Sequence, residues 1–333
     1  MIIGKEVLDT VMKEDKTITV VIVADVPETA KYNILRSFPA GWTVHITDAS
    51  HAGEFLLEAD AVIPEHIPVD AAFLDKTGKL RIVQTGAGYD NVDIEECTRR
   101  GVLVCNAAGI NANAVAEHTM AMILCWYKNI AKLDCYMKAH GNEQELDYSG
   151  AELAGKTIGI IGLGRIGKRV AELCHAFGMT VLGYSHHPIT VDGAENIELD
   201  ELYRRSDIVS VHVPLNTGTR HMLDHSVFAK MQSHALLVNT SRGAVIKEED
   251  LIHALKHHEI AGACLDVFEA EPLAQSSPFR EMPNVILTPH TAGLPDGVKY
   301  HRKRYTFFVE NISKALRGEL PEYLLNADEV HPK

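Results

Sequence analysis

The stretch TIGIIGLGRIGKRVAELCHAFGMTVLGYSHH, residues 157–187, decides the fold of this chain. It begins with a β-branched run at Thr157–Ile161, which is typical of a buried parallel strand. The glycine-rich turn GLGRIG at 162–167 follows directly, and apolar residues then recur at helical spacing as far as Gly178. Thr180–Tyr184 has the composition of a second strand. The segment therefore predicts one strand–helix–strand unit of a parallel α/β sheet.

The turn carries its three glycines at the spacing of a dinucleotide fingerprint, GxGxxG, between a strand and a helix. Gly162 would permit the tight turn, Gly164 would let the backbone approach a pyrophosphate, and Gly167 would let the helix pack close to the strand. The helix N-terminus would offer N–H groups to the phosphates. A glycine-rich turn without a ligand is the alternative, but the matching strand, turn and helix favour binding of a dinucleotide.

The residues after the second strand depart from the fingerprint. An acid that accepts hydrogen bonds from the ribose of NAD is expected near position 185, whereas this chain has Ser185-His186-His187. Without the acid, the 2′-phosphate of NADP is not repelled, and Ser185 can donate a hydrogen bond to it. The sequence therefore leaves NAD and NADP both open, with a weak preference for NADP.

Length and charge limit the class of protein. At 333 residues the chain is long enough for about two domains. Its net charge of −13 argues against a nucleic-acid partner and against binding to an anionic membrane. Apolar runs such as Ala121–Tyr127 are too short to span a bilayer, and residues 1–17 have no signal-peptide pattern. We expect a cytoplasmic protein with a small-molecule substrate.

The spacing of the cysteines and histidines indicates the redox compartment and whether a metal is bound. The six cysteines form no CxxC pair and have mostly apolar neighbours, as expected of small buried side chains in a reducing compartment. None of the 18 histidines stands in an HExxH pattern or beside cysteines at zinc-finger spacing. The sequence predicts no metal site.

Strands and helices alternate along nearly the whole chain, which predicts two doubly wound parallel sheets. We expect a Rossmann cofactor domain at 108–294, inserted into a smaller flavodoxin-like substrate domain formed by 1–107 and 295–333. A long helix is expected from Ala114 to about Ala139. The amphipathic helix from about Gly297 to Leu316 would return to the first domain, because the second sheet is complete before it. The expected strands are Ile18–Ala24, Thr43–Ile46, Ala61–Ile63, Arg81–Gln84, Val102–Val104, Thr157–Ile161, Thr180–Tyr184, Ile208–Val213, Ala235–Val238, Gly262–Val267 and Val285–Leu287.

Three expected strand ends in the second half carry charged or titratable side chains. Arg242 follows one strand, Asp266 and Glu271 follow the next, and His290 follows the last. Each alone is more simply explained as a surface or packing residue. Together, at the carboxyl edge of a sheet that binds a dinucleotide, they supply an anion clamp, a proton donor and a carboxylate partner for that donor.

A family resemblance is carried by the strings NTSRGAVI, LDVFEAEPL and ILTPHTAG, together with GLGRIG, QTGAGYDNVD and VAEHTMAMIL. In these strings the chain resembles the D-isomer-specific 2-hydroxyacid dehydrogenase family. The resemblance covers about residues 18–318. It implies that Arg242 binds the substrate carboxylate, that His290 is the acid or base, and that Glu271 hydrogen-bonds His290 and favours its protonated form.

The resemblance also implies the remaining contacts. Backbone groups of Ala87 and Gly88 would complete the carboxylate site from the other domain, and Asp266 would hold the nicotinamide amide. A homodimer with a cleft that closes between its domains is expected. The implied cofactor contacts are Gly162, Gly164, Arg165, Ile166, Gly167, Ser185, His186, Pro214, Thr240, Ser241, Asp266 and Gly293.

Two other functions occur among proteins of this kind. A nicotinamide-sensing, corepressor-like interaction protein on the same fold would have no need of Arg242, Glu271 and His290, which this chain keeps. Formate oxidation resembles a branch that has glutamine where Glu271 stands. The segment His140–Gly150 lacks a tryptophan that many glyoxylate-reducing relatives carry, which argues against glyoxylate or hydroxypyruvate as substrate. A phosphoglycerate dehydrogenase remains an alternative. Against it, the C-terminus of this sequence is too short for the regulatory domain that the long forms of that enzyme carry.

Overall fold

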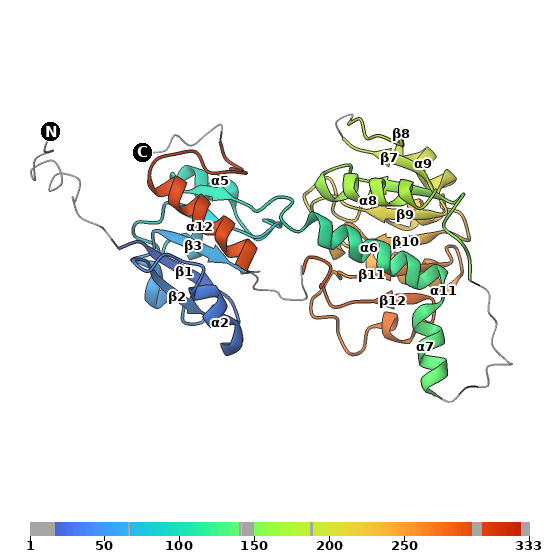
Figure 1. Cartoon of the computed structure of the whole chain (residues 1–333), viewed down its shortest axis with the longest axis horizontal. Coiled ribbons are helices and arrows are strands. Elements are labelled where there is room, and N and C mark those ends of the chain that lie inside the picture. The colour runs from blue at the N-terminus through green and yellow to red at the C-terminus, as the bar shows by residue number, and fades with distance from the viewer. Residues whose placement is uncertain are drawn as a thin grey trace, which may run out of the picture. The chain divides into compact units, whose positions relative to one another are not determined.

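The computed structural model describes residues 17–65, 67–139, 141, 150–186, 189–294 and 302–327. The chain forms two compact units, one of residues 1–108 with 300–333 and one of residues 109–299 (Figure 1). The boundaries expected from the sequence, after 107 and before 295, lie near these. Which unit binds substrate and which binds cofactor remains a prediction.

The first unit is built on a five-stranded parallel sheet in the order β2-β1-β3-β4-β5, the flavodoxin-like order. Its strand β1 lies between β2 and β3 and consists of apolar, β-branched residues that are fully buried from Val20 to Val23, as expected of a strand covered on both faces. The elements of this unit are β1 (Thr19–Val23), α2 (Glu28–Leu35), β2 (Thr43–Thr47), α3 (Gly53–Leu56), β3 (Ala61–Pro64), α4 (Ala71–Leu74), β4 (Ile82–Gln84), α5 (Ile94–Arg99), β5 (Leu103–Cys105) and α12 (Arg302–Leu316).

Helix α12 joins this unit from the far end of the chain. The Arg81 guanidinium donates a hydrogen bond to the Leu316 carbonyl at 2.9 Å, and the buried Asn311 amide donates to Gln84 Oε1 at 3.0 Å. Tyr305 and Phe308 of the helix are fully buried. These contacts fix α12 beside β4.

The second unit is built on a seven-stranded parallel sheet in the order β12-β11-β10-β9-β6-β7-β8. Chain order reverses at β6, which pairs with β9 on one side and β7 on the other. Ligands of such sheets bind outside the carboxyl ends of the strands at this reversal. The elements are α6 (Ala112–Tyr127), α7 (Ile130–Lys138), β6 (Thr157–Ile161), α8 (Arg165–Ala176), β7 (Thr180–Tyr184), β8 (Ala194–Asn196), α9 (Leu199–Arg205), β9 (Ile208–Val211), α10 (His225–Phe228), β10 (Leu236–Asn239), α11 (Glu248–Lys256), β11 (Gly262–Leu265) and β12 (Val285–Leu287).

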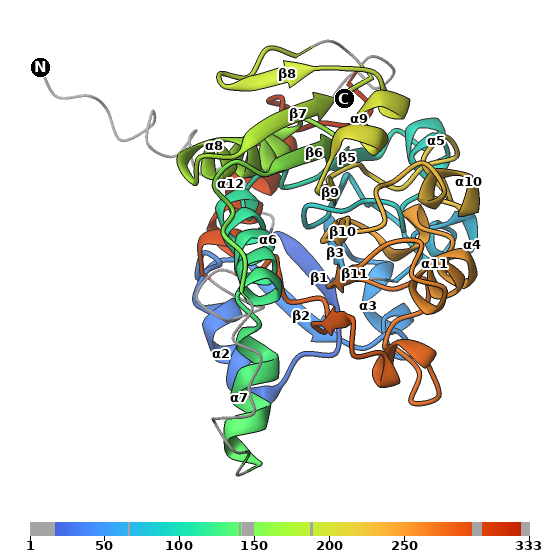
Figure 2. The same cartoon turned by 90° about the vertical axis from the view of Figure 1, so that its right-hand side faces the viewer.

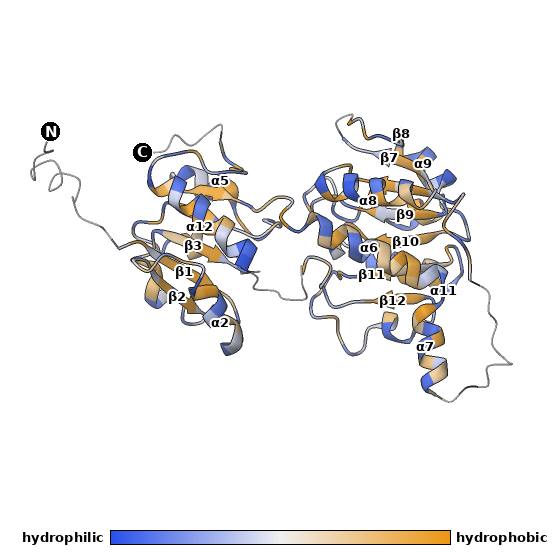
Figure 3. Cartoon of the chain, viewed as in Figure 1, coloured by the Kyte–Doolittle hydropathy of each residue, from blue (hydrophilic) through white to orange (hydrophobic). Residues whose placement is uncertain are grey.

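Helices cover both faces of the second sheet. Figure 2 shows α6 and α8 on one side of its central strands and α9, α10 and α11 on the other. Side chains alternate between the two faces, so Leu236 and Val238 join the core under α6 and α8, whereas Leu237 joins the core under α11. Apolar colour accordingly concentrates in the strands (Figure 3). The predicted architecture of two doubly wound parallel sheets is confirmed.

The expected long helix from Ala114 to Ala139 is wrong as one element. Asn129 adopts a left-handed conformation, with φ of 53°, and divides the segment into α6 and α7. The short strand β8 was not expected, because its three residues Ala194–Asn196 are too few to show a period. Part of the helix expected from Gly297 lies outside the described residues. Within the described part of the chain, no helix is both long and apolar enough to cross a membrane.

Candidate active site

The glycine-rich turn after β6 has the geometry that a dinucleotide requires. Gly162 has φ of +99°, and a Cβ there would lie 2.5 Å from the His212 carbonyl oxygen. A Cβ at Gly167 would collide with the carbonyl of Gly162, so this glycine allows helix α8 to approach the turn. Gly164 differs, because a Cβ there would meet no atom within 4 Å. The backbone of Gly164 is therefore open to a ligand, as the fingerprint demands.

Helix α8 begins at this opening. Gly164 is its N-cap residue, and Arg165 and Ile166 are its first two residues. The first N–H groups of a helix have no partner within the helix, and they carry the positive end of its dipole. A pyrophosphate beside Gly164 would lie against these groups, so the residues present fit the group that the sequence predicts.

The loop after β10 is shaped by Asn239, which is fully buried. Its side-chain oxygen accepts hydrogen bonds from the Ser241 amide at 3.0 Å and the Ser241 hydroxyl at 2.8 Å, and its amide donates to the Arg242 carbonyl at 2.9 Å. Thr240, between them, hydrogen-bonds Thr119 of α6 at 3.1 Å. Asparagine favours such local turns. The loop carrying Thr240, Ser241 and Arg242 therefore has one defined conformation.

Gly243 brings Arg242 close to the end of β11. A Cβ at Gly243 would collide with the backbone of Phe268, so only glycine lets the two loops touch there. The Arg242 guanidinium donates to the Ser241 carbonyl at 2.9 Å, and its charge helps to lower the pKa of Glu271. The clamp expected at Arg242 thus lies within electrostatic reach of the predicted acid–base pair.

His290 and Glu271 form the closest charged contact of the site. Nδ1 of His290 lies 2.6 Å from Oε2 of Glu271, and Oε1 of Glu271 accepts the Phe268 amide at 3.0 Å. Burial alone would raise the pKa of the Glu271 carboxyl, but the hydrogen bond and charge of His290 outweigh it and the pKa is lowered. Glu271 is therefore ionised at neutral pH, and Nδ1 of His290 faces a carboxylate and carries a proton.

Asp266 organises the loop that carries His290. Its carboxylate is fully buried, and its backbone carbonyl accepts the His290 amide at 2.7 Å. One carboxylate oxygen accepts the Thr288 hydroxyl at 2.6 Å and the Thr291 amide at 2.9 Å, and the other accepts the Ala292 amide at 2.9 Å. Three of about four acceptor positions are occupied. These hydrogen bonds hold the 288–292 turn, and the nicotinamide contact expected of Asp266 stays a prediction.

Sequence reasoning missed three residues that support the site: His118, His212 and Asn239. Nε2 of His118 lies 3.1 Å from the Thr288 hydroxyl and 3.6 Å from Asp266 Oδ1. Nε2 of His212 lies 2.8 Å from the Ser210 hydroxyl, and burial lowers the pKa of its ring to about 4. His118 stands inside the quoted VAEHTMAMIL string, whereas no quoted string contains His212. Asn239 stands inside the quoted NTSRGAVI string, where its turn-forming character was a usable signal.

The remaining predicted contacts are dispersed over the strand ends. Ser185 and the exposed His186 follow β7, Pro214 follows β9 at the surface, and His187 lies outside the described residues. A Cβ at Gly293 would lie 2.7 Å from the Asn111 amide nitrogen.

Ala87 and Gly88 belong to the first unit, on the loop after β4. The Ala87 carbonyl accepts a hydrogen bond from the Asn106 amide at 3.1 Å, and the neighbouring Gly86 carbonyl accepts the Ala107 amide at 2.9 Å. Both bonds use carbonyl groups. These two hydrogen bonds hold the loop through its carbonyl oxygens. We therefore expect its backbone N–H groups to be the part of the loop that binds an anion.

A family model described as D-isomer specific 2-hydroxyacid dehydrogenase, NAD binding domain, matches residues 120–292. The chain belongs to the D-isomer-specific 2-hydroxyacid dehydrogenase family. The family, the NAD-binding Rossmann domain and the status of an oxidoreductase, all expected from the sequence, are thereby confirmed.

Relatives within the 2-hydroxyacid dehydrogenase family carry different substrate names. A glyoxylate reductase of Aeropyrum pernix is 38% identical, over 79% of this chain and 81% of its own length. A D-3-phosphoglycerate dehydrogenase of Methanocaldococcus jannaschii is 37% identical, over 83% of this chain; the match spans about half, 53%, of that relative.

Among solved structures, D-lactate dehydrogenase from Aquifex aeolicus, complexed with NAD and lactic acid, superposes with a TM-score of 0.79. It is 28% identical, and the match covers 90% of this chain and 96% of that one. The 2-hydroxyacid dehydrogenase fold is therefore shared, while the names of these three proteins select no single substrate.

Proposed function

We propose that this chain interconverts a 2-keto acid and a D-2-hydroxy acid, with NAD or NADP as the hydride carrier. The contact that carries the proposal is the 2.6 Å pair between Nδ1 of His290 and Glu271, within electrostatic reach of Arg242. A general acid, a carboxylate that keeps it charged and an anion clamp are the parts that reduction of a keto acid needs. This intact trio argues against the corepressor-like alternative.

His290 is the proton donor in the direction of reduction. A nicotinamide held along the second sheet would supply the hydride for C2 of the substrate, and His290 would give a proton to the carbonyl oxygen. Because Nδ1 is committed to Glu271, Nε2 is the ring nitrogen that gives this proton. In the reverse direction the neutral ring takes the hydroxyl proton back through the same nitrogen.

Arg242 holds the substrate for this transfer. Its planar guanidinium matches a carboxylate through two parallel hydrogen bonds, and its positive charge polarises the adjacent carbonyl. The backbone N–H groups of Ala87 and Gly88 would add neutral donors to the same carboxylate. The hydrogen bonds of Asn239 support this role, because they set the conformation of the loop from which Arg242 extends.

The cofactor would lie along the carboxyl edge of the second sheet. Gly162, Gly164 and Gly167 would admit the pyrophosphate, with Arg165 and Ile166 at its side. Ser185 and His186 would meet the adenosine ribose, where the missing acid favours NADP slightly. Pro214, Thr240, Ser241, Asp266 and Gly293 would line the path toward the nicotinamide.

The substrate side chain is tested with a panel of 2-keto acids. Glyoxylate, pyruvate, hydroxypyruvate and 3-phosphohydroxypyruvate would each be reduced with NADH and with NADPH, followed by nicotinamide absorbance. We expect turnover of at least one acid, and Arg242→Lys should raise its KM more than it lowers the affinity for cofactor. Cofactor binding without turnover of any acid would instead support a nicotinamide-sensing protein.

We also propose that the chain forms a homodimer in the cytoplasm. Helix α7 exposes Ile130 and Met137 and buries none of its residues within the monomer, which leaves an apolar surface to cover. Cys97, Cys105 and Cys174 are buried thiols, and burial raises their pKa to about 12, as suits a reducing compartment. Light scattering should give twice the chain mass of 36.7 kDa.

A further inference from the structure

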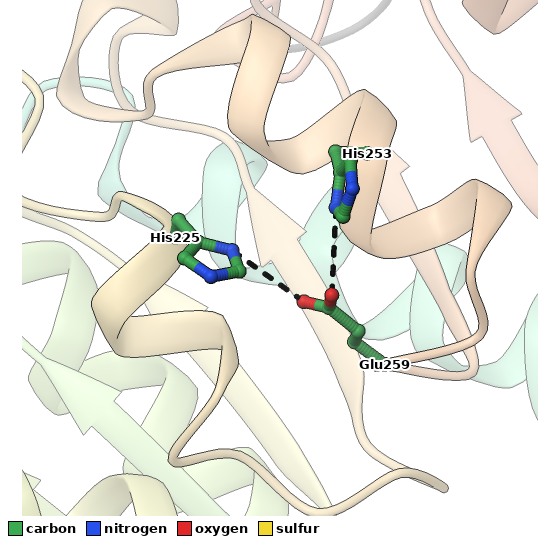
Figure 4. A group of neighbouring side chains, drawn as sticks. All are labelled: His225, His253 and Glu259. Atoms are coloured by element: carbon green, nitrogen blue, oxygen red, sulfur yellow. Dashed lines mark ion pairs between the residues drawn. The ribbon is translucent and has the colours of Figure 1, made fainter.

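Three potential metal ligands converge on the surface of the second unit. His225 is the first residue of α10, His253 lies in α11, and Glu259 follows the end of α11. Figure 4 shows both imidazole rings directed toward the carboxylate of Glu259. One ligand atom from each residue lies within 4.8 Å of the other two.

The two helices that carry the histidines are fixed to each other. Val227 and Phe228 of α10 and Leu251 and Leu255 of α11 are buried in one core. The backbone N–H of His225 also donates to Asp250 of α11 at 3.0 Å. The two histidines therefore occupy set positions on a packed scaffold, as a metal site requires.

Glu259 is placed by the way α11 ends. His258 adopts a left-handed conformation, with φ of 55°, and the Glu259 amide donates back to the Ala254 carbonyl at 2.9 Å. This is the Schellman arrangement, normally made with glycine. The next residue, Ile260, is fully buried and holds the reversed chain in the core. The turn thus directs Glu259 back toward His253 instead of away from the helix.

The contacts within the cluster are longer than hydrogen bonds. Nδ1 of His253 lies 3.4 Å from Oε1 of Glu259, and Nδ1 of His225 lies 3.8 Å from Oε2. Among the described residues, no hydrogen bond reaches Oε2, although this oxygen is buried. A buried carboxylate oxygen normally has a partner. Two imidazole nitrogens and a carboxylate thus face one another across a space that none of them closes.

Two of the ligand–ligand distances, 3.4 Å and 3.8 Å, approach those around a tetrahedral ion, and the third lies within 4.8 Å. Ligands about 2.0–2.1 Å from Zn²⁺ are about 3.3 Å from one another, close to the two distances above. Imidazole nitrogen with carboxylate oxygen is a donor set that Zn²⁺ accepts, whereas Mg²⁺ prefers oxygen alone. The histidine side chains are 61% and 52% exposed, so water can supply a fourth ligand.

We propose that His225, His253 and Glu259 bind a divalent transition-metal ion of the Zn²⁺ class, which cross-links α10 to the end of α11. This proposal departs from the expectation of no metal, and it is independent of the dehydrogenase chemistry. His257 supports it, because its ring stacks on His253 with centroids 4.0 Å apart and its Nδ1 contacts the His253 carbonyl at 2.9 Å. The His253 ring is thereby held in its orientation.

Calorimetric titration of the chelator-treated chain with ZnCl₂ at pH 7.5 tests the site. We expect one ion per chain, no comparable heat with MgCl₂, and a rise in Tm on addition of Zn²⁺. The variants His253→Asn and Glu259→Gln should each weaken Zn²⁺ binding at least about tenfold, because even the loss of a residue that only supports a ligand costs that much. Both should lose the rise in Tm.

A matched control is His234→Asn. This exposed histidine pairs with a single carboxylate, Nε2 to Asp207 Oδ1 at 2.8 Å, on the same unit. Its loss should leave Zn²⁺ affinity unchanged. Equal affinity in wild type, His253→Asn and Glu259→Gln, or an equal loss in His234→Asn, would overturn the proposal and leave a cluster of ion pairs only. Circular dichroism without metal shows whether each variant is folded.

Discussion

The carboxyl edge of the second sheet has two parts, on either side of the chain reversal at β6, and they are built in opposite ways. Beside β6 and β7 the structure depends on glycines, which have no side chain: Gly162 and Gly167 make close backbone contacts, and Gly164 leaves open space. Beside β10, β11 and β12 it depends on side chains interlocked by hydrogen bonds, with Asn239, Asp266 and Glu271 at the centre. We expect the first part to admit the cofactor and the second part to carry the reaction.

The largest effect should come from the interlocked part. Replacing His290 with Ala should lower kcat for keto-acid reduction by roughly 10²–10⁴-fold, because the proton donor is lost. Cofactor affinity should change little, since the glycine turn is untouched. Steady-state kinetics together with a fluorescence titration of NADH separate the two quantities. A variant that retains most of its kcat would show that His290 is not the donor.

Substitutions in the glycine-rich turn should lower either the affinity for the dinucleotide or the stability of the fold, depending on the residue. Gly164→Ala places a methyl group where a pyrophosphate would lie, so the dinucleotide Kd should rise about tenfold, equivalent to about 1.4 kcal/mol, with Tm unchanged. Gly162→Ala is its counterpart: the positive φ and the nearby His212 carbonyl should cost about 1–3 kcal/mol of folding free energy. Thermal unfolding and cofactor titration of both variants check this. An equal fall in Tm for Gly164→Ala and Gly162→Ala would contradict the assignment of ligand binding to Gly164 and stability to Gly162.

Glu271→Gln should shift a pH profile. The hydrogen bond and charge of His290 hold the pKa of Glu271 below its ordinary value, so Glu271 is a carboxylate at neutral pH. The negative charge favours imidazolium, the form needed for reduction. Without that charge the protonated imidazole is less stabilised, so the basic limb of kcat/KM against pH should move to lower pH. An unmoved limb would contradict the pairing.

The smallest effect should concern the cofactor. With Ser185 in place of an acid, NADPH should be preferred modestly over NADH, because Ser185 can donate a hydrogen bond to the 2′-phosphate that an acid would repel. Ser185→Asp should reverse the preference by repelling the 2′-phosphate. Values of kcat/KM for both cofactors at pH 6 and 8 decide it. Strong NADH preference of the wild type at both pH values would refute the assignment.

Local pattern was enough to determine much of this protein. The glycine spacing at 162–167 and the buried β-branched runs predicted both parallel sheets, because strand period and turn conformation are set by neighbouring residues. The same applies to Arg242, Glu271 and His290, which follow consecutive strands of a parallel sheet and so emerge at one edge. The break at Asn129 was missed, since a single left-handed residue leaves the apolar pattern of a helix intact.

Only the tertiary structure decided which side chains meet across elements. His118 approaches Asp266 from a helix more than a hundred residues earlier in the chain, and no spacing in the sequence encodes that contact. His225, His253 and Glu259 escaped a search for metal motifs for the same reason. They lie on two helices and a loop, and they converge only because α10 and α11 share one core and α11 ends in a reversed turn.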